Sequence, residues 1–123
     1  YLYAGEADGD PYQWLRELAG WSPIIHLQQT DGKSSAHWPF NAETNRAGII
    51  EGTRVLEAIR DHYASAEETG TLPPRVTDIY LTLEVFAGTA ETPEQIRKKV
   101  RESAEYWRTF IPADGETVDR LLK

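Results

Sequence analysis

The sequence contains no cysteine, and none of its apolar runs is long enough to form a membrane-spanning helix. The lack of cysteine excludes a framework of disulfide bonds. No segment resembles a secretory signal peptide. From these absences we expect a soluble globular protein in the reducing environment of the cytoplasm, without a membrane partner.

Basic residues are scarce. Lysine and arginine together number 13, against 20 aspartates and glutamates, which gives a formal net charge of −7. The basic residues are scattered, so they form no run that could follow the phosphates of a nucleic acid. We therefore expect no nucleic-acid partner. A small phosphorylated substrate is compatible with this charge, because one or two local Lys or Arg side chains can hold a phosphate.

Methionine is also absent, and the sequence begins at Tyr1. Since translation starts at methionine, we expect either a processed N-terminus or a fragment of a longer protein. The order of the predicted helices and strands favours the fragment.

The first half of the chain carries signals for a helix, a strand and a long loop. Asp10 as N-cap and Pro11 as first helical residue predict a helix over 11–19. A β-branched start predicts a strand over 24–28, and the polar stretch 29–48 predicts a loop of a length that is usually functional or disordered. The expected apolar stripe of the first helix consists of Trp14, Leu15, Leu18 and Ala19.

The second half repeats this alternation. It predicts a helix over 53–66, a strand over 79–86, a helix that is capped by Thr92 and runs to about Ile111, and an amphipathic tail at 118–122. An alternating order of this kind indicates parallel strands joined by a crossover helix. The helix beginning at Pro93 should cover the outer face of the last strand, which is formed by Ile79, Leu81, Leu83 and Val85.

The fold class that we predict is α/β, as the C-terminal portion of a (β/α)8 TIM barrel with about two parallel strands and three helices. A complete barrel needs on the order of 250 residues, so 1–123 would form a single partial domain with an active-site loop at about 29–48. Because a partial barrel exposes strand edges and one sheet face, we expect the isolated chain to be poorly stable or to self-associate.

Two polar residues occupy equivalent positions in the two strands. Side chains alternate along a strand, so His26 and Glu84 both lie opposite the aliphatic face, near the C-terminal end. In parallel barrels these ends form the active-site face. An imidazole and a carboxylate are suitable ligands for Zn, Mn, Co or Fe. Either residue taken alone is more often a hydrogen-bonded structural residue, but the repeated position favours a shared metal.

These residues also carry a family resemblance. The run IHLQQTDG from Ile25 resembles the penultimate-strand motif of xylose isomerase-like TIM barrels, and Glu84 in LTLEVF is similar to the glutamate ligand of their last strand. More narrowly, HLQQTD, HWPF at His37, YWR at Tyr106 and IPADG at Ile111 resemble the tetrulose-phosphate (erythrulose-phosphate) 3-epimerase branch of the sugar phosphate isomerases and epimerases. Further site residues of that family would lie upstream of Tyr1.

The resemblance implies a metal-dependent proton transfer next to the carbonyl of a small ketose phosphate. His26 would be a metal ligand, and Glu84 both a ligand and the catalytic acid/base, with Mn, Mg, Co or Zn as the divalent ion. Trp38 with Phe40 would form an apolar lid, with packing of the loop against the barrel rim as the open alternative. His62 would be a surface residue without a role. The expected substrate-binding residues are Gln28, Gln29, Lys33, His37, Trp38 and Arg46, although simple solvated charge remains an open interpretation of Lys33 and Arg46.

Two other classes of protein remain open. The chain could be a non-catalytic or designed half-barrel domain that retains His26 and Glu84 as relic ligands. A metal-dependent hydrolase or DNA-repair nuclease on the same scaffold is the third interpretation, and the acidic charge without a basic groove argues against it.

Overall fold

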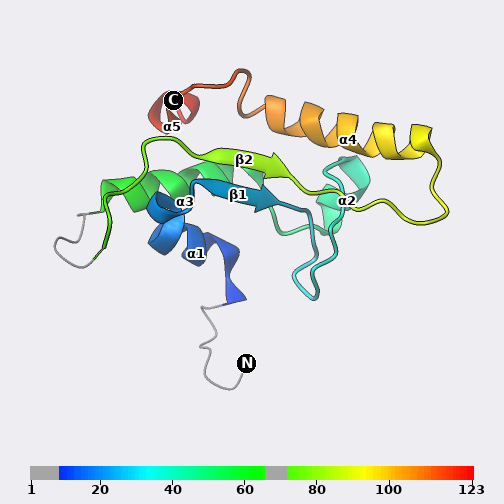
Figure 1. The fold of residues 1–123 in the computed structure, drawn as a ribbon, viewed down its shortest axis with the longest axis horizontal. Helices are drawn as coiled ribbons and strands as arrows, with labels where there is room; N and C mark the ends of the chain where they lie inside the picture. Colours follow the sequence, from blue (N-terminus) through cyan, green and yellow to red (C-terminus); the bar gives the residue numbers. More distant parts are fainter. Residues whose placement is uncertain (1–8, 66–71) are drawn as a thin grey trace.

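The computed structural model of the chain describes residues 9–65 and 72–123 (Figure 1). They form a mixed α/β arrangement in which helices and strands alternate in the predicted order. In chain order the elements are α1 (Pro11–Leu18), the 3-10 turn η2 (Ala19–Trp21), β1 (Ile24–Leu27), α2 (Ala42–Ala47), α3 (Gly52–Ala64), β2 (Tyr80–Leu83), α4 (Pro93–Arg108) and α5 (Val118–Leu121).

The two strands are adjacent and parallel, as predicted. Ile24 lies opposite Tyr80, and Leu27 lies opposite Leu83. Both strands are shorter than the predicted 24–28 and 79–86, because β1 leaves the ladder at Leu27 and its chain next pairs Gln29 with Trp38 in an antiparallel bridge. Beyond that point β2 has no partner strand among the described residues.

The hydrophobic core lies on one face of this sheet. Leu27 is buried there together with Val55, Ala58 and Ile59 of α3, and Trp107 of α4 closes the same cluster. Burying side chains of this kind contributes roughly 1.5–3 kcal/mol each for the larger ones. Figure 1 shows α1 close to β1, and α4 running back from beyond the arrowhead of β2 toward the end of that strand. α4 contacts β2 as predicted. Ile79, Leu81 and Leu83 of the predicted outer face pack against the core cluster that includes Trp107 of α4, and Val85 is not part of that packing.

Helix α1 is rotated relative to the predicted stripe. Asp10 caps it by accepting a hydrogen bond from the Tyr12 N–H at 2.9 Å, as expected. However, Tyr12 and Ala19 are the buried residues, while Trp14 and Leu18 are exposed. The Tyr12 hydroxyl donates to the Ile49 carbonyl at 2.5 Å and accepts from the Glu51 N–H at 2.9 Å. These two bonds turn Tyr12 inward, and the prediction for Trp14 and Leu18 was wrong for that reason.

The predicted loop 29–48 contains a helix, α2. Its N-cap Asn41 accepts hydrogen bonds from the N–H groups of Glu43 and Thr44, in a capping box with the Thr44 side chain. Just before it, Phe40 is fully buried against Tyr106 and Trp107, and its N–H donates to Ser103 Oγ at 2.9 Å. Phe40 therefore anchors the loop to α4 and does not form the predicted lid.

The remaining helix boundaries and one histidine also depart from expectation. α3 ends at Ala64, and residue 66 of the predicted helix lies outside the described residues. α4 begins with the predicted capping box of Thr92 and Gln95 but ends at Arg108, before Ile111. His62, predicted on the surface, is buried because its Nδ1 donates to the Arg16 carbonyl at 2.7 Å across the α1–α3 contact. No helix in the described part of the chain is long and apolar enough to cross a membrane.

Candidate functional site

The sheet face opposite the core changes character along the strands. At its N-terminal end Ile24 and Tyr80 are 58% and 68% exposed. Toward the C-terminal end the side chains become polar, with His26 opposite Thr82 in the register. Glu84 follows β2 directly, and its N–H donates to the Leu27 carbonyl at 2.8 Å. This bond extends the ladder one step past the strand and fixes the place where the Glu84 side chain emerges.

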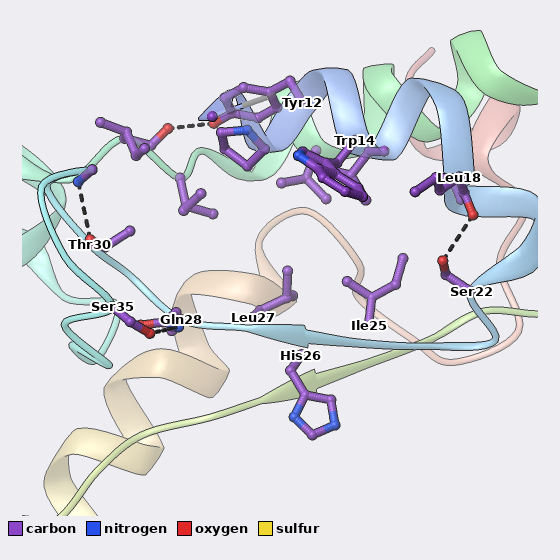
Figure 2. Close-up of a pocket in the computed structure, with 18 of the residues that line it drawn as sticks. Tyr12, Trp14, Leu18, Ser22, Ile25, His26, Leu27, Gln28, Thr30 and Ser35 are labelled. Carbon is purple, nitrogen blue, oxygen red and sulfur yellow. Dashed lines mark hydrogen bonds between the residues drawn. The ribbon is translucent and has the colours of Figure 1, made fainter. Parts of the chain in front are cut away.

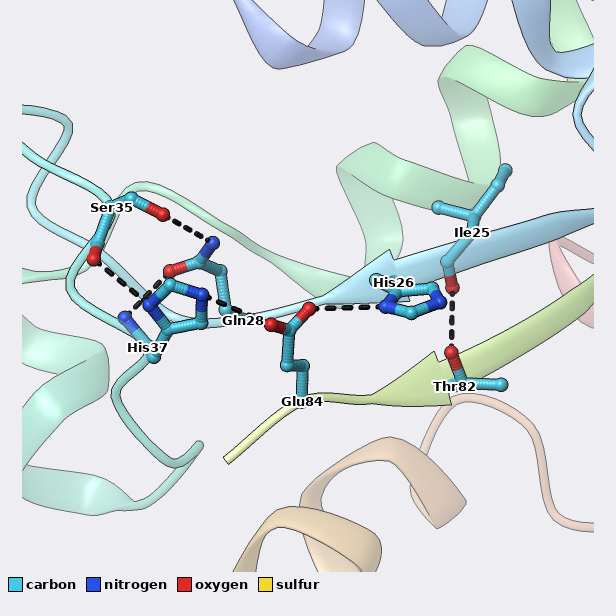
Figure 3. A network of polar contacts seen from close by, with 7 residues as sticks. All are labelled: Ile25, His26, Gln28, Ser35, His37, Thr82 and Glu84. Atoms are coloured by element: carbon cyan, nitrogen blue, oxygen red, sulfur yellow. Dashed lines mark hydrogen bonds and ion pairs between the residues drawn. The ribbon is translucent and has the colours of Figure 1, made fainter. Parts of the chain in front are cut away.

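His26 and Glu84 meet beyond the strand ends. His26 Nδ1 lies 3.1 Å from Glu84 Oε2 (Figure 3). The side chains are 64% and 32% exposed, and an ion pair this open to solvent contributes at most about 1 kcal/mol to stability. The two residues are thus brought together, as expected from their equivalent positions, without a large contribution to folding.

A third residue, His37, joins this pair from the loop. Its Nε2 lies 3.0 Å from Glu84 Oε1 (Figure 3). Its ring stacks on Phe86 with the centroids 3.7 Å apart and the planes at 5°. The ring nitrogen Nδ1 lies 2.9 Å from the Ser35 carbonyl oxygen. Because that carbonyl is only an acceptor, Nδ1 carries a hydrogen. The Nε2 contact is then attractive only if Nε2 also carries a hydrogen or if Glu84 is protonated.

Gln28 holds the backbone of this loop. Its Oε1 accepts the His37 N–H at 2.6 Å, and its Nε2 donates to Ser35 Oγ at 3.0 Å. The structure therefore places Gln28 and His37, both predicted to bind substrate, in one network with Glu84. The HWPF motif identified His37 as a candidate residue. Its contact with Glu84 depends on the Gln29–Trp38 bridge, which brings the loop back to the strand ends and cannot be predicted from the sequence.

Gln29 has a different place from the predicted one. It is completely buried. Its Nε2 donates to Asn45 Oδ1 and to the Ile50 carbonyl, and its Oε1 accepts the N–H groups of Thr30 and Ile50. Gly48 passes so close that a Cβ atom there would lie 2.1 Å from Gln29 Cδ. Gln29 therefore holds the loop from inside, and both ends of its side-chain amide are bonded to other parts of the loop.

The other predicted substrate-binding residues lie outside the network. Lys33 is exposed on the loop, and Arg46 is exposed on α2, where its Nε donates to the Ala42 carbonyl at 3.1 Å. Trp38 is half-buried and forms the bridge with Gln29. Their proposed contacts with a substrate stay predictions.

The donors at the strand ends fit part of a metal shell. An imidazole nitrogen and a carboxylate are ligands that divalent ions use, and His26 and Glu84 present both at one place. A stable site takes about three or four ligands, however. Within residues 9–65 and 72–123, no group of three or more His, Cys, Asp or Glu is arranged to hold a metal ion. These residues therefore supply a pair of candidate ligands, not a complete site.

A separate groove of about 590 Å³ runs between α1 and β1. Figure 2 shows Ile25 and Leu27 pointing into it, whereas the His26 ring projects from the other side of the strand. Trp14 and Leu18 line the opposite wall. His26 is among the residues that line the groove, whereas Glu84 is not.

The fold and the site define an α/β protein in which polar groups meet at the C-terminal ends of two parallel strands. No family model matches this chain. It is 30% identical over 108 residues to D-erythrulose 1-phosphate 3-epimerase from Brucella abortus (strain 2308). The match covers 88% of this chain and 31% of that protein, so the chain spans about a third of the length of the curated relative that it matches. The chain is thus a distant relative of a sugar-phosphate epimerase over that segment.

Proposed function

We propose that this chain carries part of the active site of a divalent-metal-dependent epimerase that acts on a small ketose phosphate. The observation that carries the proposal is the 3.1 Å approach of His26 Nδ1 to Glu84 Oε2 beyond the ends of two parallel strands. Catalytic groups of (β/α)8 barrels lie at this end of the strands, and the parallel pair is compatible with a C-terminal part of such a barrel. The relationship to D-erythrulose 1-phosphate 3-epimerase supports the reaction class.

His26 and Glu84 would hold the ion, with Mn, Mg, Co or Zn as candidates, and the remaining ligands would come from another part of the protein. When bound, the ion would stabilise the negative charge that develops on the carbonyl oxygen of the substrate. His26 is the more exposed of the two, and one of its ring nitrogens is directed at Glu84. A small rotation of the ring would direct that nitrogen at an ion that Glu84 also binds. Its role would be binding alone.

Glu84 would also transfer the proton. Epimerisation next to a carbonyl breaks a C–H bond, and the electron pair moves toward the carbonyl oxygen while an oxygen of Glu84 takes the proton. Inversion requires a proton to return on the opposite face of that carbon. A second acid must supply it, and we place that acid in the part of the protein that completes the site.

The loop 29–48 would contact the rest of the substrate. Lys33 and Arg46 are exposed there and remain the candidates for the phosphate group, whose charge a local Lys or Arg can balance. Trp38 would lie near the substrate at the rim of the site. The net charge of −7 is compatible with a small ligand and not with a polymer of phosphates.

Deuterium exchange tests the proton transfer. The complete gene product would be incubated with D-erythrulose 1-phosphate and Mn²⁺ in deuterated water, and NMR would follow deuterium entering at the carbon next to the carbonyl. We expect exchange in the wild type and none in Glu84→Gln. His26→Ala should regain much of its rate at high Mn²⁺ concentration, because it mainly weakens metal binding. Glu43→Gln, an exposed carboxylate on α2, is the matched control.

Metal titration separates this proposal from a non-catalytic domain with relic ligands. Calorimetry with Mn²⁺ should show weak binding by the present chain and much tighter binding by a form that contains all the ligands. Normal turnover by Glu84→Gln with normal metal content would contradict the catalytic role of Glu84. Absence of both exchange and metal binding in the complete gene product would favour the non-catalytic alternative.

A further inference from the structure

We propose that His37 is a positioning residue that fixes the carboxylate of Glu84, and this inference rests on the proposed function only for its consequence in metal binding. The two histidines next to Glu84 differ sharply in how they are held. The His26 side chain is 64% exposed, whereas that of His37 is 17% exposed. His37 is therefore suited to hold Glu84 in place, while His26 is the accessible candidate ligand.

The His37 backbone is in an unusual conformation. Its φ is 51°, and it is the one non-glycine residue with positive φ in the described part of the chain. Residues other than glycine rarely adopt this backbone conformation, and they keep it where surrounding contacts enforce it. Here the contacts are the bond from the His37 N–H to Gln28 Oε1 and the bond from the Phe86 N–H to the His37 carbonyl at 3.4 Å.

The ring of His37 is fixed by three further contacts. Phe86 stacks on one face of the ring. The Ser35 carbonyl accepts from Nδ1, and Nε2 is directed at Glu84 Oε1 (Figure 3). With Nδ1 committed to Ser35, only Nε2 can face the site. Its position leaves Glu84 Oε2 directed toward His26.

This arrangement determines the orientation of the carboxylate. A glutamate side chain rotates about several bonds, so an unsupported Glu84 would lose the geometry that a ligand or proton acceptor needs. Groups that hydrogen-bond to a ligand orient it and typically change metal affinity by about 10- to 100-fold. Gln28 belongs to the same support, because it holds the His37 N–H.

Side-chain relaxation NMR tests the positioning without any metal or substrate. In the wild type, the Glu84 side chain should be ordered, in contrast to exposed Glu43. His37→Phe keeps an aromatic ring for the stack on Phe86 but removes both ring nitrogens, and it should raise the mobility of Glu84 to that of Glu43. His37→Gln should restore part of the order, and Lys33→Ala, in the same loop, should leave it unchanged. Equal order of Glu84 in the wild type and in a folded His37→Phe variant would overturn the proposal.

Zn²⁺ titration of the complete gene product gives the second readout. His37→Phe should weaken Zn²⁺ binding by about 10- to 100-fold, with partial recovery in His37→Gln. Unchanged affinity in His37→Phe would also overturn the positioning role. If the wild type bound no Zn²⁺, the metal part of the proposed function would fail, and the order of the Glu84 side chain would still decide whether His37 positions it.

Discussion

The two faces of the sheet contrast in packing and in chemistry. On the helix-covered face, Leu27 is buried together with Phe40, Val55 and Trp107 in one hydrophobic cluster. On the opposite face, Ile24 and Tyr80 are exposed, and Glu84 makes its contacts through polar atoms. The same two strands thus serve folding on one side and a candidate site on the other. We therefore expect that substitutions of the residues most relevant to function change the stability of the fold least.

The largest expected effect sharpens this contrast with two phenylalanines. Phe40→Ala should lower the free energy of unfolding by about 3–5 kcal/mol, because it removes a fully buried ring that packs on Tyr106 and Trp107. Phe86→Ala, on the polar side and 58% exposed, should cost about 1 kcal/mol or less. Urea unfolding of both variants measures the difference. Equal losses would remove the distinction between the two faces.

The next largest effect concerns the buried amide of Gln29. Gln29→Leu keeps a side chain of similar size but leaves partners such as Asn45 and the Ile50 N–H without their hydrogen bonds. Each buried polar group left unsatisfied costs roughly 1–3 kcal/mol. Thermal unfolding should show the loss, with Gln28→Leu as the less buried neighbour for comparison. An unchanged melting temperature of Gln29→Leu would mean that the loop does not depend on the hydrogen bonds of Gln29.

A smaller effect, dependent on pH, is expected at Tyr12. Burial raises the pKa of the Tyr12 hydroxyl above its usual 10.0, against the opposing bond from the Glu51 N–H. The folded chain therefore keeps this proton at a pH where the unfolded chain has lost it. The resulting stability is complete below about pH 10 and is lost as the pH rises through the folded-state pKa.

Tyr12→Phe should cost about 1–3 kcal/mol at neutral pH, because two hydrogen bonds disappear. It should also make unfolding less sensitive to pH above about 10, which urea titrations at several alkaline pH values would measure. Tyr63, whose pKa burial also raises, remains in the variant, so the sensitivity is reduced and not abolished. An unchanged alkaline profile would show that Tyr12 does not titrate on unfolding.

Self-association should respond to the apolar end of the exposed face. Replacing Ile24 and Tyr80 with threonine places a residue that strands favour at both positions and removes two large exposed side chains. We expect the double variant to elute as a smaller species than the wild type in size-exclusion chromatography. Monomeric behaviour of the wild type at high concentration would contradict the predicted association.

The smallest effect on stability is expected at the site itself. His26→Ala should change the free energy of unfolding by less than about 1 kcal/mol, since its contact with Glu84 is exposed to solvent. The same substitution should weaken Mn²⁺ binding in calorimetry. A large loss of stability in His26→Ala would indicate a structural residue and would remove the contrast between the two faces.

Much of the local structure could be predicted from short-range patterns. The caps at Asp10 and Thr92 mark the starts of α1 and α4, because capping involves residues only two or three positions apart. Side-chain alternation placed His26 and Glu84 on the face opposite the core. Boundaries were less accurate, since the end of β2 depends on where β1 leaves the ladder.

The α/β order, the parallel crossover and the equivalent positions of His26 and Glu84 follow from residue patterns along the chain. The burial of Gln29 and His62 and the contact of His37 with Glu84 follow from three-dimensional packing alone. Gln29 bonds to Ile50, 21 positions away, and His62 bonds to Arg16, 46 positions away. Contacts of this range depend on how helices and loops pack, and neither residue type nor periodicity specifies them.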